Sequence, residues 1–144
     1  MRVYLDICCF NRPFDVQTQV RVRLEAEAKL AIQEEIRAGK IELGWSYIMD
    51  FENDANPFTE RKLSISKWRN IATTDVVETD EILARAKSLN ELGFKKLDSL
   101  HLACAIELRC DCFLSTDDRI LKRRDLVMGI EILNPIDYFT RGDD

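Results

Sequence analysis

The chain has 144 residues, of which 46% are hydrophobic and 33% are charged, a composition typical of an ordinary globular protein with a single domain over 1–144. The 21 Lys and Arg residues against 26 Asp and Glu residues give a net charge of -5, which argues against a DNA-binding protein whose affinity rests on overall positive charge. An enzyme that acts on nucleic acid is not excluded, because bound divalent cations would offset negative charge where phosphate lies.

The cysteines and the N-terminal sequence indicate an intracellular protein. Neither the pair Cys8–Cys9 nor the run 110–112 has the ligand gap typical of a zinc knuckle, so we expect free, buried thiols. The first apolar run stops at Asp6, too early for the core of a signal peptide. No apolar run approaches the roughly 20 residues that span a bilayer. We therefore expect a soluble, cytoplasmic protein with no membrane segment.

The first half of the chain predicts two strands and three helices. A short strand at 3–5 stops at Asp6, and a loop at 11–13 leads to a helix at 20–36 whose apolar stripe includes Leu24 and Ala28. Gly39 ends this helix, and a second strand follows at 41–45. Ser46 then caps a helix that ends near 56–57, and another helix runs over 58–71.

The second half continues the alternation of strands and helices. In the helix at 58–71, Leu63, Ile65 and Trp68 are the expected core anchors. The elements that follow are a short strand at 75–78, a helix capped by Thr79 and closed by Gly93, an apolar helix at 97–106, a strand at 112–115, a basic helix at 119–124, a strand at 130–132 and a short helix from Pro135. The helix at 97–106 is apolar on most sides, which predicts a central, buried position.

No hairpin signal separates consecutive strands, so the strands are expected to run parallel. The sequence therefore predicts an α/β fold, a three-layer α/β/α sandwich around a central, mostly parallel sheet of about five strands. No linker, repeat or low-complexity tract divides the chain, which again predicts one domain.

Four acidic residues are candidates for a common site. Asp6 and Asp117 each follow a predicted strand, and the carboxyl ends of parallel strands lie at one edge of a sheet, where ligands bind. Asp98 stands near the start of the apolar helix, where a simple N-cap is the alternative role. Glu52 lies in the helix after the second strand. We expect all four carboxylates to meet at this edge.

Carboxylates that meet at one edge repel each other, by about 4 kcal/mol per pair at 4 Å in a medium of effective dielectric near 20. Such a group persists when a hard dication binds it, and oxygen ligands without a nearby histidine favour Mg²⁺ or Mn²⁺ over zinc. The one histidine, His101, follows Asp98 by one helical turn. A packed or hydrogen-bonded His101 is favoured over a ligand or a base.

Four segments resemble, in order, the motifs of the PIN domain family, a metal-dependent ribonuclease domain found in many bacterial toxins, including those of the VapC type. They are Val-Tyr-Leu-Asp at 3–6, Ser46 with Glu52 six residues later, the run Leu-Asp-Ser-Leu-His-Leu-Ala-Cys-Ala at 97–105, and Phe-Leu-Ser-Thr-Asp at 113–117. Together they cover nearly the whole chain. The resemblance implies the PIN-like fold and a Mg²⁺- or Mn²⁺-dependent endoribonuclease.

The resemblance also implies the roles of particular residues. Its acidic, catalytic and metal-binding quartet corresponds to Asp6, Glu52, Asp98 and Asp117, with Asp118 as a fifth candidate metal ligand. The candidate substrate-binding residues are Arg12, Asn11 and Arg119, which lie beside these motifs. The chain departs from the family after the first acid, where the family often has a hydroxyl and then Asn or Ser, and this chain has Ile7 and Cys8.

Other readings of the same residues stay open. A PIN-like module that binds RNA or protein with weak or no cleavage is the main alternative, favoured by the Ile7–Cys8 departure and the acidic net charge. A phosphoacceptor signalling domain would want paired acids after the first strand and a late lysine, and neither is evident. If the protein is a toxin, the resemblance implies RNA as substrate, an antitoxin protein as partner and a homodimer.

Overall fold

The computed structural model describes residues 1–141 and contains one five-stranded sheet. The strands are β1 (Arg2–Leu5), β2 (Glu42–Ser46), β3 (Thr74–Val76), β4 (Cys112–Leu114) and β5 (Glu131–Leu133). Their order is β3-β2-β1-β4-β5, and each neighbouring pair is parallel. The predicted α/β class and parallel sheet are confirmed.

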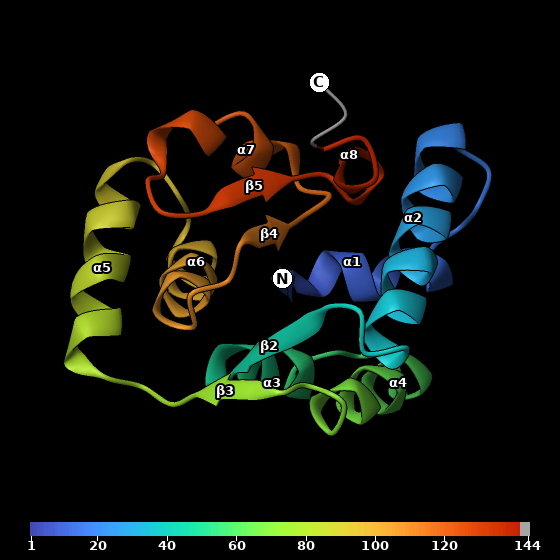
Figure 1. Ribbon diagram of the computed structural model, residues 1–144, viewed down its shortest axis with the longest axis horizontal. Helices are drawn as coiled ribbons and strands as arrows, with labels where there is room; N and C mark the ends of the chain where they lie inside the picture. The colour runs from blue at the N-terminus through green and yellow to red at the C-terminus, as the bar shows by residue number, and fades with distance from the viewer. Residues whose placement is uncertain (142–144) are drawn as a thin grey trace.

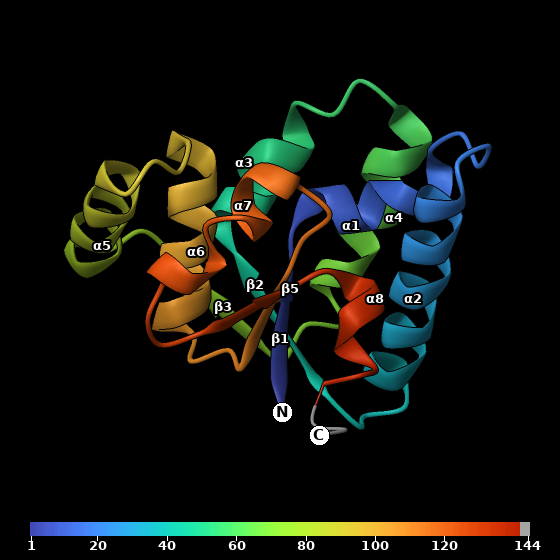
Figure 2. The same cartoon turned by 90° about the horizontal axis from the view of Figure 1, so that it is seen from above.

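Helices connect the strands and cover both faces of the sheet. They are α1 (Ile7–Asn11), α2 (Val20–Arg37), α3 (Tyr47–Asp54), α4 (Thr59–Arg69), α5 (Asp80–Glu91), α6 (Lys96–Glu107), α7 (Asp118–Leu121) and α8 (Pro135–Tyr138), with short 3-10 helices η1 (Arg12–Phe14) and η2 (Arg124–Leu126). Figures 1 and 2 show α5 and α6 on one side of the sheet and α2 on the other, which confirms the predicted layers. Among the described residues, no helix is long and apolar enough to cross a membrane.

The core is centred on β1 and α6. Val3, Tyr4 and Leu5 are fully buried, and the Tyr4 ring stacks on Phe113 of β4 with 5.4 Å between ring centroids. Helix α6 is buried over most of its length, as its apolar sequence predicted. Each large apolar side chain buried in this way stabilises the fold by about 1.5–3 kcal/mol. The central strand is thereby held rigidly where it ends, at Asp6.

The carboxyl ends of the strands form one edge of the sheet, at the top of Figure 2, where α1, α3 and α7 begin. Strand β1 has β2 on one side and β4 on the other, so the connections leave the central strand in opposite directions. Ligands of open parallel sheets bind where the direction of the connections reverses. The topology alone therefore marks the end of β1 as the expected site.

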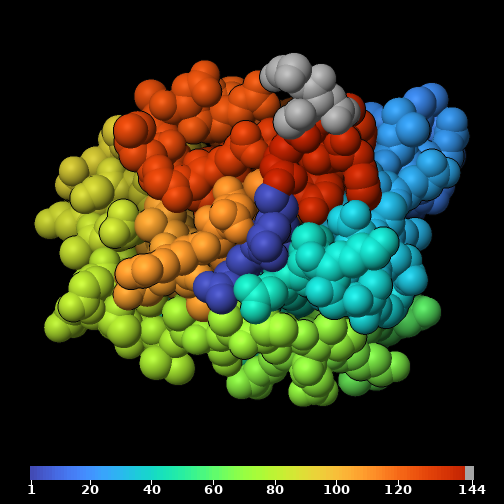
Figure 3. Space-filling model, viewed as in Figure 1, coloured from blue at the N-terminus to red at the C-terminus, as the bar shows by residue number. Residues whose placement is uncertain are grey.

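Polar contacts of the N-terminal segment close the opposite edge. The Arg2 guanidinium pairs with Glu42 at 3.3 Å, and the Arg2 backbone N–H donates to Asp111 Oδ2 at 2.8 Å. Figure 3 shows the N-terminal residues, in blue, lying between the start of β2 and the orange segment that leads into β4. These contacts fix the amino ends of three adjacent strands.

The buried face of α2 agrees only in part with the predicted apolar stripe, of which Ile32 and Ile36 are buried. Leu24 is 47% exposed, whereas Glu25 is fully buried. The Glu25 carboxylate accepts from Arg12 Nε at 2.8 Å and from Arg21 Nε at 3.1 Å, and the Asn134 amide also donates to it. Because these donors satisfy the carboxylate, burying a glutamate on the inner face is tolerated and the leucine faces outward.

Smaller differences concern α1, α4 and α7. The five-residue helix α1 was not predicted, because the sequence indicated only a loop at 11–13, and Asp6 caps this helix. In α4, Ile65 and Trp68 are buried as predicted, but Leu63 is 60% exposed. The basic helix expected at 119–124 is shorter, since α7 ends at Leu121 and η2 follows. A short helix leaves no room for a periodic pattern, which is why sequence periodicity misses such elements.

Candidate metal centre

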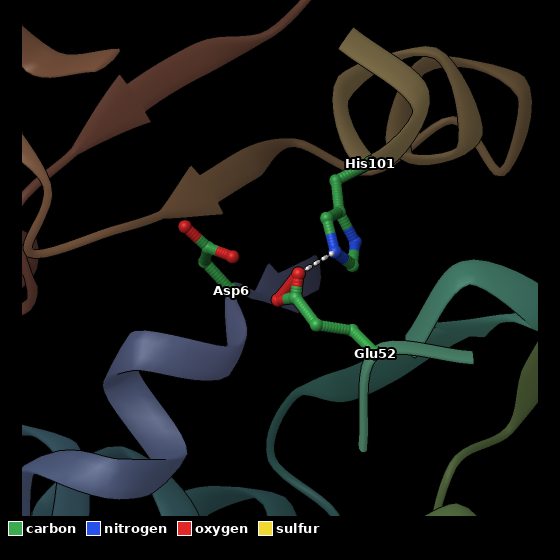
Figure 4. A group of neighbouring side chains, drawn as sticks. All are labelled: Asp6, Glu52 and His101. Carbon is green, nitrogen blue, oxygen red and sulfur yellow. Dashed lines mark hydrogen bonds and ion pairs between the residues drawn. The ribbon is translucent and has the colours of Figure 1, made fainter. Parts of the chain in front are cut away.

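Asp6, Glu52 and His101 come together at the carboxyl edge of the sheet (Figure 4). One ligand atom of each residue lies within 4.8 Å of those of the other two. Asp6 directly follows β1, Glu52 lies on α3 and His101 lies on α6. Figure 4 shows the three side chains directed toward one another from these separate elements. Three segments far apart in the sequence thus form one group of potential metal ligands.

Asp6 is held in place by donors on both of its oxygens. The Ile7 backbone N–H donates to Oδ1 at 2.8 Å, and the Ser115 hydroxyl donates to Oδ2 at 2.9 Å. The Cys8 thiol also lies on Oδ2, at 3.4 Å. The hydroxyl that the sequence lacks directly after the first acid is therefore supplied by Ser115, from the segment that follows β4.

Burial raises the pKa of the Asp6 carboxyl above its usual value, and the negative charge of Glu52 raises it further. The positive character of His101 and the hydrogen bonds from Ser115 and Cys8 oppose this change. The net direction means that the charged carboxylate is destabilised in the metal-free protein. A bound cation would stabilise the charged carboxylate and so offset this destabilisation.

A chain of hydrogen bonds ties Glu52 to the core. His101 Nε2 lies 3.4 Å from Glu52 Oε2, and His101 Nδ1 lies 2.6 Å from the Tyr4 hydroxyl, which is 2.7 Å from Ser46 Oγ. Although burial acts to lower the pKa of His101, the hydrogen bond to Glu52 and the charges of Asp6, Glu52 and Asp98 raise it above its usual value. In the protonated imidazole both nitrogens donate, Nε2 to Glu52 and Nδ1 to the Tyr4 hydroxyl. The hydrogen-bonded role predicted for His101 is confirmed. The sequence argument that the ligands lack a nearby histidine is wrong.

Asp98 shares the electrostatic environment of this group. It is half-buried in the first turn of α6, whose N-cap is Lys95, so Asp98 is not the cap. Burial, followed by the charges of Asp6, Asp117 and Glu52, raises the pKa of Asp98 to about 6, while His101 acts to lower it. The charges of the other three acids thus reach Asp98, but the close group of ligand atoms described within residues 1–141 contains Asp6 and Glu52 and neither Asp98 nor Asp117.

The pKa of Asp98 makes the stability of the metal-free protein depend on pH. The carboxyl is raised from 3.8 to about 6, so the folded state binds this proton more tightly than the unfolded state does. Its contribution to stability is present below about pH 4 and is lost as the pH rises through about 6. Because Asn carries no charge, the melting temperature of Asp98→Asn minus that of the wild type should rise across this window and then level off. Thermal melts in EDTA measure it, and a difference independent of pH would contradict it.

The Asp117 carboxylate forms an ion pair with the neighbouring Arg119 side chain. Asp117 caps α7 by accepting from the Arg119 backbone N–H at 2.9 Å, and its carboxylate pairs with Arg119 Nη2 at 3.1 Å. Although burial acts to raise the pKa of Asp117, the hydrogen bonds and charge of Arg119 lower it below its usual value. Arg119, a candidate substrate-binding residue, is therefore placed directly beside the acids.

Asp118 lies outside the group of Asp6, Glu52 and His101. Its side chain is 72% exposed, and its two oxygens accept from Arg21 at 2.7 and 2.8 Å. In this arrangement the carboxylate ties α7 to α2. A role as a fifth metal ligand would require this pair to open.

Arg12 and Asn11 lie at the end of α1. The Arg12 guanidinium bonds Glu25 at 2.8 Å and Asp15 at 3.0 Å, so it is already engaged with two carboxylates. The Asn11 Oδ1 atom is buried and has no hydrogen-bond partner within residues 1–141. Their assignment to the substrate remains a prediction, and for Arg12 a structural role is plain.

We expect Arg12→Ala to destabilise the fold by about 1–3 kcal/mol, because the buried Glu25 loses a charged donor while Arg21 and Asn134 remain. Arg124→Ala, at an exposed arginine, should stay within about 0.5 kcal/mol of the wild type. Urea unfolding of both variants measures this, and equal stabilities would contradict it. Under conditions where both fold, Arg12→Ala should also weaken RNA binding more than Arg124→Ala if Arg12 contacts the substrate.

A parallel five-stranded sheet with carboxylates at its carboxyl edge defines a PIN-like α/β domain, and comparison with solved structures confirms the fold. FitAcB from Neisseria gonorrhoeae matches with a TM-score of 0.59 and 12% identity, over 92% of this chain and 97% of that chain. VapBC2 from Rickettsia felis, bound to a DNA fragment from their promoter, matches with a TM-score of 0.55 and 12% identity, over 93% and 98% of the two chains. Neither a family model nor a curated protein matches the sequence. The resemblance is thus confirmed at the level of the fold.

Sequence reasoning missed the residues that hold the acids in place. The sequence places Tyr4 and Ser115 in predicted strands and in the family-like motifs but assigns neither a role, yet Ser115 bonds Asp6 and Tyr4 bonds His101. The position of Ser115, beside the carboxyl end of a predicted strand, could have pointed to it. For Tyr4 the sequence carries no such signal.

Proposed function

We propose that the protein is a metal-dependent endoribonuclease that hydrolyses RNA phosphodiester bonds. The observation that supports this most is the group of Asp6, Glu52 and His101 at the carboxyl edge of the sheet. The charges of Asp6 and Glu52 also raise the pKa of Asp98, which places this carboxyl in the field of the same group. Carboxylates placed so close are costly unless a cation binds them, and a bound cation beside a nucleic acid phosphate is the usual basis of hydrolysis.

The residues present fit a divalent cation. Two carboxylates and an imidazole offer atoms within 4.8 Å of one another, close to the separation of about 4 Å across an ion with ligands near 2.1 Å. We propose Mg²⁺ or Mn²⁺, held by the carboxylates, with the His101 imidazole donating to Glu52 and so orienting it. When bound, the ion supplies a Lewis acid that activates water and polarises the phosphodiester.

We propose a separate role for each residue of the site. Asp6 and Asp98 hold the ion most directly, and Glu52 and Asp117 complete the set, with Asp118 as a fifth candidate. Ser115 fixes the orientation of Asp6, and His101 fixes that of Glu52. Arg12, Asn11 and Arg119 are proposed to contact the RNA. No side chain needs to act as a covalent nucleophile, and the products are proposed to carry 5′-phosphate and 3′-hydroxyl ends.

Incubation with a panel of structured RNAs in Mg²⁺, Mn²⁺ or EDTA tests the proposal. We expect cleavage with Mn²⁺ or Mg²⁺ and none with EDTA, with 5′-phosphate ends on the products. The absence of cleavage by folded protein with either metal would count against it.

The main alternative is a PIN-like module that binds RNA or protein with little or no cleavage. One observation favours it: Arg119 already pairs with Asp117, which weakens the negative charge available to a cation. If this alternative is correct, the protein would bind RNA without metal-dependent cleavage, and Asp98→Asn would bind RNA as the wild type does.

The fold likeness also supports proposals about partners. VapBC2 is a complex bound to a promoter fragment. By analogy, we propose that this chain is the toxin of a toxin–antitoxin pair, forms a homodimer and works in the cytoplasm. Light scattering of the purified protein tests the dimer, and co-purification with the product of a neighbouring gene tests the antitoxin.

A further inference from the structure

A hollow of about 220 Å³ lies directly beside Asp98, between the start of α6 and helix α7. Four basic residues line it, namely Lys95, Arg119, Lys122 and Arg123, and Asp98 is the one acidic residue on its wall. The volume equals that of about seven waters, enough for a hydrated anionic group. One wall of the hollow is therefore shared with the acidic site.

The positive charge of this hollow is only partly balanced. Four cations meet two carboxylates, Asp98 on the wall and Asp117 in an ion pair with Arg119, which leaves an excess of two positive charges. Arg119 pairs with Asp117, and Arg123 donates to the Arg119 carbonyl at 3.0 Å. Within residues 1–141, the side chains of Lys95 and Lys122 form no hydrogen bond or ion pair. The ammonium groups of Lys95 and Lys122 are therefore available to bind an anion.

The backbone around the hollow brings the cations close together. Gly93 adopts a φ of 106°, and a Cβ atom there would lie 3.0 Å from Arg123 Nε. The positive φ favours glycine, and the absence of a Cβ lets the Arg123 guanidinium lie against this turn without shifting. Helix α6 begins at Lys96 without a side-chain cap, so its first N–H groups add positive potential on the same side.

We propose that the hollow binds a phosphate of the RNA backbone next to the one that is cleaved, with Lys95 and Lys122 as its principal contacts. The inference rests on the proposed nuclease function, because Asp98 belongs to both sites. An anion in the hollow lies beside the acids that would hold the cation, which is the place a continuing RNA strand must occupy. An acidic peptide would match the same charges but gives no reason for this position.

The test compares two double variants that each remove two lysine charges. Lys95→Ala with Lys122→Ala removes the proposed contacts, and Lys40→Ala with Lys67→Ala removes two exposed lysines that precede the amino ends of β2 and β3. Binding of a fluorescent single-stranded RNA is titrated at several salt concentrations. EDTA is present throughout, because it prevents metal-dependent cleavage. Lys95→Arg with Lys122→Arg restores the charges and separates charge from folding.

We expect the Lys95/Lys122 alanine variant to bind about tenfold more weakly at low salt, and its salt slope to fall by about 0.7 for the lost phosphate contact. The arginine pair and the Lys40/Lys67 variant should keep the wild-type slope. Equal slopes for the two alanine variants would overturn the proposal and assign the cations to another anion, such as an acidic peptide. So would a wild type that binds no RNA in EDTA.

Cleavage in Mn²⁺ is measured separately and decides the proposed function. If the wild type cleaves RNA while the two alanine variants show equal slopes, the nuclease stands and the phosphate subsite fails. If the wild type binds RNA with the expected slopes but does not cleave it, the subsite stands and the nuclease fails. In an active enzyme, loss of this contact should raise KM more than it lowers kcat, because binding away from the cleaved bond is lost.

Discussion

Mn²⁺ at a hundredfold excess over its Kd is expected to raise the melting temperature of the protein by about 8 °C. A ligand that binds only the folded state adds RT ln(1 + [L]/Kd), about 2.7 kcal/mol at this excess, and a domain of this size gains roughly 3 °C per kcal/mol. The reason lies in the group of Asp6, Glu52 and His101, whose ligand atoms converge within 4.8 Å. Thermal melts in EDTA and then in Mg²⁺ or Mn²⁺ measure the shift.

Asp6→Asn should change these melts in two opposite ways. In EDTA the variant should melt at a higher temperature than the wild type, because the raised pKa of Asp6 shows that its charge is destabilised in the folded state. In metal the rise should shrink, because a ligand is lost. Asp125→Asn, at an exposed acid, is the matched control and should do neither. If the melting temperature of the wild type is the same with and without millimolar metal, the proposed metal centre is contradicted.

Cleavage should fall by more than about a hundredfold in Asp98→Asn while the protein remains folded. Loss of groups that merely support metal ligands already costs 10–100-fold, and Asp98 is proposed to contact the ion itself. Folding should survive because Asp98 is not the cap of α6, and Asn preserves its shape. Initial rates in saturating Mn²⁺, with circular dichroism on the same samples, measure the effect.

Asp125→Asn is again the control for the cleavage assay, since it removes one acidic charge away from the group. Full activity of folded Asp98→Asn would show that this residue does not bind the ion. A loss of activity in Asp125→Asn as large as that in Asp98→Asn would show that the loss is not specific to Asp98.

The sequence predicted the sheet and the acids for the same physical reason. Short apolar runs that end in a carboxylate mark both the buried strands and the edge at which they stop, so Asp6 and Asp117 could be placed from a linear pattern. Ser46 was predicted to cap a helix, and it does so by accepting from the Met49 backbone N–H. Local signals of this kind survive into the folded protein.

The contacts that position the acids could not be predicted in this way. The bond between Tyr4 and His101 joins residues 97 positions apart, and nothing local to either residue marks it. The prediction of the inner face of α2 fails for a related reason. Glu25 is buried because Arg21, one turn earlier in α2, and two donors from other segments, Arg12 and Asn134, satisfy it. A pattern of apolar residues assumes instead that carboxylates face water.

The bond from Ser115 to Asp6 has a consequence for the synthesis of the protein. The chain emerges from the ribosome with its N-terminus first, and β1 can pair with β2 early. The fixed orientation of Asp6 and the carboxylate of Asp117 arrive only when the segment after β4 has been translated. A nascent chain that lacks this segment carries three of the four acids without the donor that orients the first. Under the proposed function, a complete site would therefore require that the segment after β4 has been translated and has folded against β1.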